Sequence, residues 1–239
     1  MSIYEHLWYI VETESLFSTN SRIAQYILLN YKIIENKRLD DIAYGSNVVK
    51  STVSKFFKGI TENGSYDSFL AAIDSEKKDM NISENQTKKK QNLISCEDIE
   101  LQFLVNSIRN SSKVIFFSNE SNITCIRKFC EKLIDERIIG KTAPYFYKNT
   151  IKDEILSLNE NDCVIFVDLE KSFYEHILRL GFEIDFFSLI SKCKCQIINL
   201  SSTDEKVSGV KTIVLNDKSQ ISNSLYLDGI FNSVLQNMK

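Results

Sequence analysis

Apolar residues recur at helical spacing through the first third of the chain. Leu7, Ile10 and Val11 mark a first amphipathic segment, and Thr19 or Asn20 is expected to cap the next one. After this apolar-rich leader at 2–17, the spacing predicts a helix at 21–30, a pair of helices within 39–60 whose second runs from about Val49 to Ile60, and a short helix from Ser65 or Asp67 to Ile73. The chain is therefore expected to open with a small bundle of short helices, with a turn at 61–65 before the last of them.

From residue 113 onward, short continuous apolar runs alternate with amphipathic segments. The runs predicted as strands are 113–117, 143–147 after a turn at Gly140, 162–167, 196–200 and 211–215. The predicted helices are 94–108, 123–137, 173–180, 185–191 and 220–236. Strands separated by helices are typical of a parallel sheet with right-handed crossovers. Ligands bind at the carboxyl ends of such strands, which directs attention to 118–122, 168–172 and 200–203.

A polar stretch separates the two patterns. Residues 74–92 read DSEKKDMNISENQTKKKQN, which is typical of a linker. The predicted organisation is a helical domain at 1–78, a linker at 79–92 and an α/β domain at 93–239. The lysine run at 88–90 could touch a DNA backbone, but a solvated connector is the favoured interpretation.

The stretch 39–60, LDDIAYGSNVVKSTVSKFFKGI, has the pattern of two short helices joined by a tight turn. Gly45 is expected at the turn, in the left-handed or otherwise unusual conformation that glycine tolerates. The second helix has an apolar face made of Val49, Val53, Phe56, Phe57 and Ile60. No acidic residue lies between Asp41 and Glu62. This pattern is typical of a helix-turn-helix, although an ordinary amphipathic surface helix has the same spacing.

The polar positions of the second helix are suited to the major groove of double-stranded DNA. The candidate DNA-binding residues are Lys50, Ser51, Thr52, Ser54, Lys55 and Lys58. Lysines supply phosphate contacts, and small hydroxyls near the start of a helix can approach base edges. Because one helix-turn-helix buries too little surface for tight specific binding, a homodimer or homotetramer is expected. The helices 94–108 and 220–236 are the candidate interface.

The segment from Asn20 to Ala72 resembles the N-terminal domain of the RpiR family of bacterial transcription regulators. The matching stretches are SRIAQYILLNY, DDIAYGSNVVKSTVSKFF and GSYDSFLAAI, and the family signature corresponds to Thr52, Val53, Lys55, Phe56, Gly64, Tyr66 and Phe69. Two positions depart from it. Val49 stands where the family has a capping serine, so Ser46 or Asn47 must cap the helix or the cap is lost. Lys55 replaces an arginine, which keeps the charge but loses the bidentate fork.

The stretch from Lys113 to about Phe231 resembles the SIS (sugar isomerase) domain that follows the helix-turn-helix in this family. The resemblance implies a three-layer αβα fold, binding of a sugar or sugar phosphate effector, and control of carbohydrate-metabolism genes. The candidate ligand-binding residues are Ser118, Ser121, Asn122, Asp168, Lys171 and Ser172.

The phosphate-binding loops of the SIS domain are not preserved in this sequence. The stretch 118–122 has none of the family's glycines, and DLEKSF replaces the hydroxyl-rich loop at 168–173, although Glu175 still fits. Asp168 and Glu170 would each repel a phosphate dianion by about 1 kcal/mol or more. A degenerate domain that keeps the fold and the dimer contacts is therefore expected, and an uncharged or amino sugar fits better than a phosphomonoester.

Composition narrows the function further. The 239 residues carry a net charge of −3, so a nucleic-acid surface must be local. The absence of a long apolar run, signal peptide or lipidation pattern predicts a cytoplasmic protein that makes no membrane contact. The six cysteines have the pattern of buried reduced thiols, and neither a metal site nor a cofactor is expected.

No catalytic set is apparent, and His176 is the one histidine of the second domain, so an enzyme is not expected. Two alternatives stay open: a phosphosugar isomerase-like enzyme and a non-DNA-binding oligomeric adaptor. Retention of DNA would separate the regulator from both.

Overall fold

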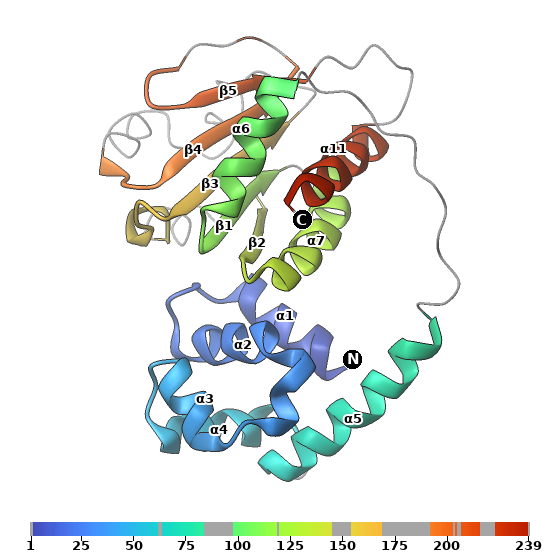
Figure 1. Cartoon of the computed structure of the whole chain (residues 1–239). Helices are drawn as coiled ribbons and strands as arrows, with labels where there is room; N and C mark the ends of the chain where they lie inside the picture. The colour runs from blue at the N-terminus through green and yellow to red at the C-terminus, as the bar shows by residue number, and fades with distance from the viewer. Residues whose placement is uncertain are drawn as a thin grey trace. The chain divides into compact units, whose positions relative to one another are not determined.

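The computed structural model describes residues 2–61, 64–83, 98–118, 120–144, 154–168, 192–202, 204, 207–215 and 223–238. The chain divides into two compact units, residues 1–90 and 91–239 (Figure 1). Within the described ranges, no helix has both the length and the apolar character needed to cross a membrane.

The first unit is entirely helical. Its elements are α1 (Ile3–Thr13), α2 (Thr19–Leu29), the 3-10 helix η1 (Tyr31–Asn36), α3 (Leu39–Gly45), α4 (Lys50–Ile60) and α5 (Tyr66–Ser83). Helix α1 packs on α2 and α5, and α4 packs on α2, α3 and α5. The helical bundle and the helix pair predicted from residues 39–60 are therefore present.

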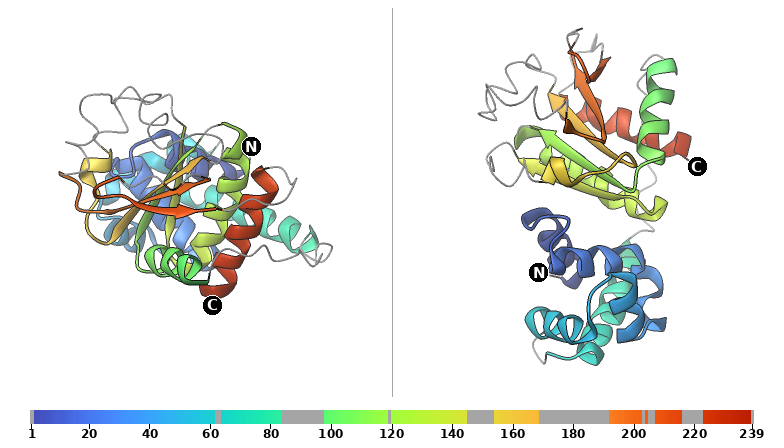
Figure 2. Two further views of the ribbon diagram at one scale, coloured as in Figure 1. Left: turned by 90° about the horizontal axis from the view of Figure 1, so that it is seen from above. Right: turned by 90° about the vertical axis from the view of Figure 1, so that its left-hand side faces the viewer.

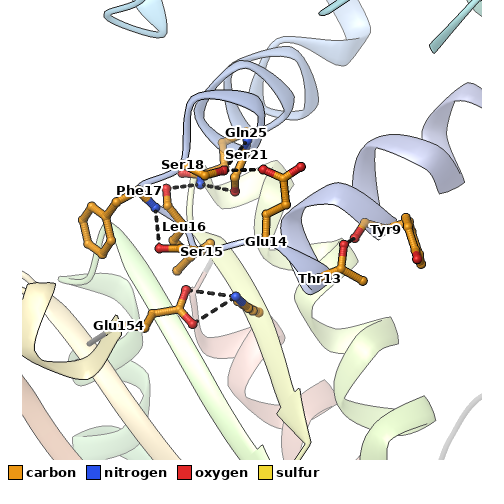
Figure 3. Close-up of polar contacts among 11 residues, drawn as sticks. Tyr9, Thr13, Glu14, Ser15, Leu16, Phe17, Ser18, Ser21, Gln25 and Glu154 are labelled. Carbon is orange, nitrogen blue, oxygen red and sulfur yellow. Dashed lines mark hydrogen bonds and ion pairs between the residues drawn. The ribbon is translucent and has the colours of Figure 1, made fainter. Parts of the chain in front are cut away.

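The corner between α1 and α2 is held by side-chain hydrogen bonds (Figure 3). The hydroxyl of Ser18 donates to Glu14 Oε2 at 2.6 Å and accepts from the backbone N–H of Ser21 at 3.1 Å. Buried Gln25 donates to the Leu16 carbonyl at 2.7 Å. Ser18 is thus the N-cap of α2, and the prediction of Thr19 or Asn20 in that position is wrong.

Helix α5 is longer than predicted, because it continues past Ile73 to Ser83. Its extension starts in the polar segment where the apolar pattern stops. The Glu76 carboxylate accepts hydrogen bonds from the first two backbone amides of α1 and, at 3.0 Å, from the phenol of Tyr31. A carboxylate at the N-terminus of a helix is favourable, so the contact of Glu76 with α1 stabilises the extension of α5, where apolar periodicity is missing.

The second unit contains a five-stranded sheet. The strands are β1 (Lys113–Ser118), β2 (Ile139–Pro144), β3 (Asp162–Asp168), β4 (Gln196–Ser201) and β5 (Lys211–Val214), in the order β2-β1-β3-β4-β5. Every adjacent pair is parallel, as the alternating pattern predicts. The chain adds β2 on one side of β1 and then β3, β4 and β5 in turn on the other side, so the strand order reverses direction at β1.

Strand β2 begins at Ile139, four residues earlier than predicted. The prediction of a turn at Gly140 is therefore wrong. Gly140 lies inside the strand, and a Cβ built on it would sit 2.6 Å from Cys130 Sγ on the helix α7 (Glu120–Leu133). The left-handed residue that turns the chain is Arg137, with φ 62°. Gly140 is therefore required for close packing of a strand on a helix.

The described helices of this unit are α6 (Asp98–Arg109), α7, the 3-10 helix η3 (Ile134–Glu136) and α11 (Asn223–Met238). Helices α6, α7 and α11 gather on one face of the sheet (Figure 2). Phe116 of β1 contacts Phe129 of α7 and Phe231 of α11 there. Phe117 and Phe166 stack on each other and are also buried. The helices predicted at 173–180 and 185–191 lie outside the described residues, so the third layer stays a prediction.

Candidate functional site

Helix α4 has one buried face and one solvent-facing side. Its buried residues are Val53, Phe56 and Phe57. The prediction that Val49 belongs to this apolar face is wrong, because Val49 is the exposed N-cap residue, and Ile60 is half-buried. Phe57 packs against Tyr66 and Phe69 of α5, with ring centroids 5.0 and 4.7 Å apart. The six residues predicted to contact DNA lie outside the buried face: Lys50, Ser51, Lys55 and Lys58 are exposed, and Thr52 and Ser54 are half-exposed. The aromatic packing thus fixes which side of the helix is available to a partner.

The N-terminus of α4 has no side-chain cap. Its N-cap residue, Val49, has no group that could accept from the first amides. The hydroxyl of Ser46 donates back to the Ile42 carbonyl at 2.6 Å, and Asn47 adopts a left-handed conformation with φ 53°. Of the two outcomes left open by the sequence, the loss of the cap is the one observed.

The prediction that Gly45 adopts the left-handed or otherwise unusual conformation of the turn is wrong. Gly45 is the last residue of α3, and the left-handed position of the turn belongs to Asn47. Asparagine tolerates this conformation better than most residues. The requirement for glycine at position 45 comes instead from the ring of Tyr26, which occupies the space where a Cβ would lie.

Arg22 of α2 holds the turn from the other side. Its guanidinium donates to the Ser46 carbonyl at 2.7 Å and to the Asn47 carbonyl. These carbonyls follow the C-terminus of α3, where a cation is favourable. Arg22 therefore positions α4, and no local pattern in the sequence points to it, because its partners lie more than twenty residues away.

The cationic surface includes one ion pair. The ammonium of Lys50 lies 2.9 Å from Asp40 Oδ2 of α3, and both side chains are more than half exposed. The sequence places no acid on α4 itself, but the fold brings Asp40 to its first turn. An exposed pair of this kind contributes only about 0–1 kcal/mol, so a phosphate can replace the carboxylate at small cost.

The candidate ligand site lies where β1 and β3 end side by side. Ser118 and Val167 are register partners, and the Ser118 hydroxyl donates to the Val167 carbonyl at 3.0 Å. Asp168, the last residue of β3, is in register with Ser201 of β4. The loops predicted to form the site therefore start from neighbouring strands, at the edge where parallel sheets bind ligands.

Asn122 is the most informative residue at this edge. It lies in the first turn of α7, it is 1% exposed, and its Oδ1 has no hydrogen-bond partner. A buried acceptor without a donor costs about 1–3 kcal/mol. Of the other predicted residues, Ser121 is in α7, whereas Lys171 and Ser172 lie outside the described residues.

Two buried polar features of this unit were not predicted. Asn199 of β4 is 1% exposed, and neither atom of its amide has a partner. The ammonium of Lys141 on β2 lies 2.9 and 3.0 Å from the two carboxylate oxygens of Glu154, and both side chains are almost fully buried. Figure 3 shows the two contacts to the Glu154 carboxylate. The sequence signal for Asn199 is a single amide within an apolar run.

The described cysteines are free thiols, and all of them except the half-buried Cys193 are buried, as the sequence predicts. Burial raises the pKa of Cys163 to about 12, helped by the neighbouring Asp162 carboxylate. Burial likewise raises the pKa of Cys125.

In the part of the chain that the structure describes, no three His, Cys, Asp or Glu side chains are grouped as metal ligands.

Comparison with known proteins yields a likeness in solved structures only. No protein-family model matches the chain, and no relative is found among curated proteins. The NanR protein of Vibrio vulnificus, solved with ManNAc-6P, is 13% identical with a TM-score of 0.43, over 99% of this chain and 91% of that one. The sugar isomerase domain of an RpiR transcription factor from Sphaerobacter thermophilus is 11% identical with a TM-score of 0.44. The match covers 71% of this chain and 88% of that one. At these values the likeness assigns neither a family nor an activity.

Proposed function

We propose that this protein is a DNA-binding transcription regulator of the RpiR type, whose helical unit binds operator DNA through the outer side of α4. The observation that carries the proposal is the division of α4 into a buried aromatic face and an exposed side with Lys50, Lys55 and Lys58. The helix itself carries no acidic residue. The fold therefore concentrates positive charge locally in a chain whose net charge is −3.

The dimensions of the helix suit this role. An α-helix fits the major groove of B-DNA, where lysines reach phosphates and small hydroxyls reach base edges. Ser51 and Thr52 lie in the first turn of α4, the part of a recognition helix that approaches the bases. The packing of Phe57 on α5 and the hydrogen bonds of Arg22 to the turn hold the helix in a fixed orientation.

The α/β unit is proposed to oligomerise and to sense a sugar-like effector that controls carbohydrate-metabolism genes in the cytoplasm. The proposed site is the edge where β1 and β3 end, with Ser118, Asn122 and Asp168. The unpaired Oδ1 of Asn122 requires a donor, which a sugar hydroxyl or amine provides. The acidic residues Asp168 and Glu170, which repel a phosphate dianion, are the reason to favour an uncharged or amino sugar as the class of effector.

The test is selection from randomised DNA duplexes, followed by measurement of affinity for the selected sequence at several salt concentrations. Wild-type protein is expected to enrich a defined site with two half-sites. Lys55→Ala and Lys58→Ala are each expected to weaken binding to all sequences and to lower the salt slope by up to about one. Ser51→Ala or Thr52→Ala should change sequence preference more than the salt slope.

Lys32→Ala is the matched control, because it removes an exposed lysine that lies on η1 and not on α4. It should leave affinity and slope unchanged. A phosphosugar isomerase-like enzyme and an oligomeric adaptor both predict that no duplex is enriched. Unchanged affinity in the Lys55→Ala/Lys58→Ala double variant would show that another surface binds the DNA.

A further inference from the structure

Two large apolar side chains are exposed where α4 begins. Val49, its N-cap residue, is 67% exposed, and Tyr44 of α3 is 91% exposed. Both line an open hollow of about 610 Å³ at the turn, together with Ala43, Gly45, Asn47 and Val48. Among the described residues, Tyr44 and Val49 are the exposed large apolar side chains that adjoin the cationic helix.

The residue at this position is unusual for a helix N-cap. A serine, threonine, aspartate or asparagine there typically stabilises a helix by about 1 kcal/mol relative to an apolar residue. Val49 forgoes this contribution and also leaves its methyl groups in water. No packing inside the fold accounts for the valine, because most of its surface remains exposed.

The surroundings indicate which kind of partner covers the hollow. Lys50 directly follows Val49, and Lys55 and Lys58 are exposed further along the same helix. A partner at this surface therefore has to combine negative charge with an apolar group. The major groove of DNA does so, because it is flanked by phosphates and its one apolar group is the thymine 5-methyl.

We propose that Val49, with Tyr44 beside it, contacts the 5-methyl group of a thymine and so determines a preference for thymine at one position of each half-site. This inference rests on the proposed function and adds a specificity residue to it. The hydroxyls of Ser51 and Thr52 then read neighbouring base edges by hydrogen bonding, whereas Val49 recognises a base by apolar contact alone.

The experiment uses duplexes selected from a randomised pool by the wild-type protein. In each selected duplex, every thymidine is replaced in turn by deoxyuridine, which lacks the methyl group but keeps the base-pairing hydrogen bonds. At one position of each half-site, wild-type binding is expected to weaken about fourfold, the factor for one buried methylene-sized group. Val49→Ala should bind the thymidine and deoxyuridine duplexes equally at that position, while every other deoxyuridine effect stays as in wild type.

Ile33→Ala is the matched control, because Ile33 is an exposed aliphatic residue that lies on η1 and does not line the hollow. It should keep the thymine preference of wild type. The fluorescence of Trp8, the one tryptophan of the chain, checks that each variant folds.

Three outcomes would overturn the inference. If wild type selects a site but Val49→Ala keeps every deoxyuridine penalty, Val49 reads no thymine while the proposed function stands. If wild type enriches no duplex, both the inference and the proposed function are wrong. If Val49→Ala changes the mass in light scattering and leaves the deoxyuridine penalties intact, the hollow is covered by a second copy of the chain.

Discussion

Gly45 of α3 lies so close to Tyr26 of α2 that a Cβ built on the glycine would sit 1.9 Å from Cε2 of the tyrosine ring. The two residues bring the C-terminus of α3 onto the middle of α2. Arg22 reaches the turn from one helical turn earlier on α2 and donates to the carbonyls that follow Gly45. The orientation of α4 therefore depends on the absence of a side chain at position 45.

Gly45→Ala is expected to destabilise the helical unit by about 1–3 kcal/mol, because the Tyr26 ring or the backbone must move. Gly59→Ala is the matched control, since a Cβ added at Gly59, near the end of α4, would meet no heavy atom within 4 Å. It should raise stability by about 0.5–1 kcal/mol. Urea unfolding followed by Trp8 fluorescence measures both changes. Equal stability of Gly45→Ala and wild type would show that Tyr26 yields without cost.

Asp40→Asn is expected to strengthen DNA binding. The substitution removes the carboxylate that lies 2.9 Å from Lys50, so the ammonium is released toward phosphate and a negative charge leaves the surface. The affinity should rise by up to about fivefold, because the exposed pair that DNA must break contributes at most about 1 kcal/mol. Asp67→Asn, an exposed carboxylate in the first turn of α5, is the control. Equal affinity of Asp40→Asn and wild type would mean that this ion pair does not lie at the DNA surface.

Tyr66 makes the helical unit sensitive to alkaline pH. Its phenol donates to the carbonyls of Ile34 and Lys37, and burial, aided by the Asp41 carboxylate, raises the pKa of Tyr66 to about 12. The folded state thus holds the proton more tightly than the unfolded state. Its contribution to stability is complete below about pH 10 and is lost as the pH rises toward about 12.

Tyr66→Phe should lower the free energy of unfolding by about 1 kcal/mol at neutral pH, because two carbonyls lose their donor. It should also reduce the decline of stability in the alkaline range. Tyr31, whose pKa is likewise raised by burial, accounts for part of the remaining decline. Tyr9→Phe changes an exposed phenol and serves as control. An alkaline decline that is identical in Tyr66→Phe and wild type would contradict the assignment.

Asn122→Leu is expected to weaken effector binding. Calorimetric titration with hexoses and hexosamines, beside their phosphates, should find ligands among the unphosphorylated forms, because Asp168 and Glu170 repel a phosphate dianion. A hydroxyl or amine of the ligand is expected to donate to the unpaired Oδ1 of Asn122. Loss of this hydrogen bond should weaken binding roughly tenfold or more. Asn199→Leu exchanges another buried, unpaired amide on β4 and should leave binding intact. Binding of a phosphosugar alone would show that the acidic loop still accepts a dianion.

Ile99→Asp is expected to weaken the association of subunits. Ile99 lies at the start of α6 and is 83% exposed in the single chain, on one of the two helices proposed for the interface. Burying an isoleucine contributes about 1.5–3 kcal/mol, so the dissociation constant should rise roughly tenfold or more. Gln102→Asp adds the same charge at an exposed position of α6 and is the control. Light scattering at micromolar concentration gives the mass, and an unchanged mass for Ile99→Asp would place the interface elsewhere.

The sequence determines the features of this protein that depend on local periodicity. The apolar runs at 113–117, 162–167 and 196–200 are strands of a parallel sheet, because a strand buried on both faces needs a continuous apolar run. The run at 211–215 forms the edge strand β5, which is only partly buried. The spacing of Val53, Phe56 and Phe57 correctly identifies the centre of the buried face of α4, although the same spacing wrongly includes Val49, which is exposed.

Only the tertiary structure decided the features that depend on residues far apart in the chain. Glycine is common in turns, so the sequence predicts turns at both Gly45 and Gly140. In the structure each glycine is needed because a side chain distant in sequence, Tyr26 or Cys130, occupies the place of its Cβ. The partners of Arg22 and of Lys50 are likewise brought together by the packing of separate helices. Periodicity reports which side of an element is buried but not what it is buried against, and that contact is created only when the chain folds.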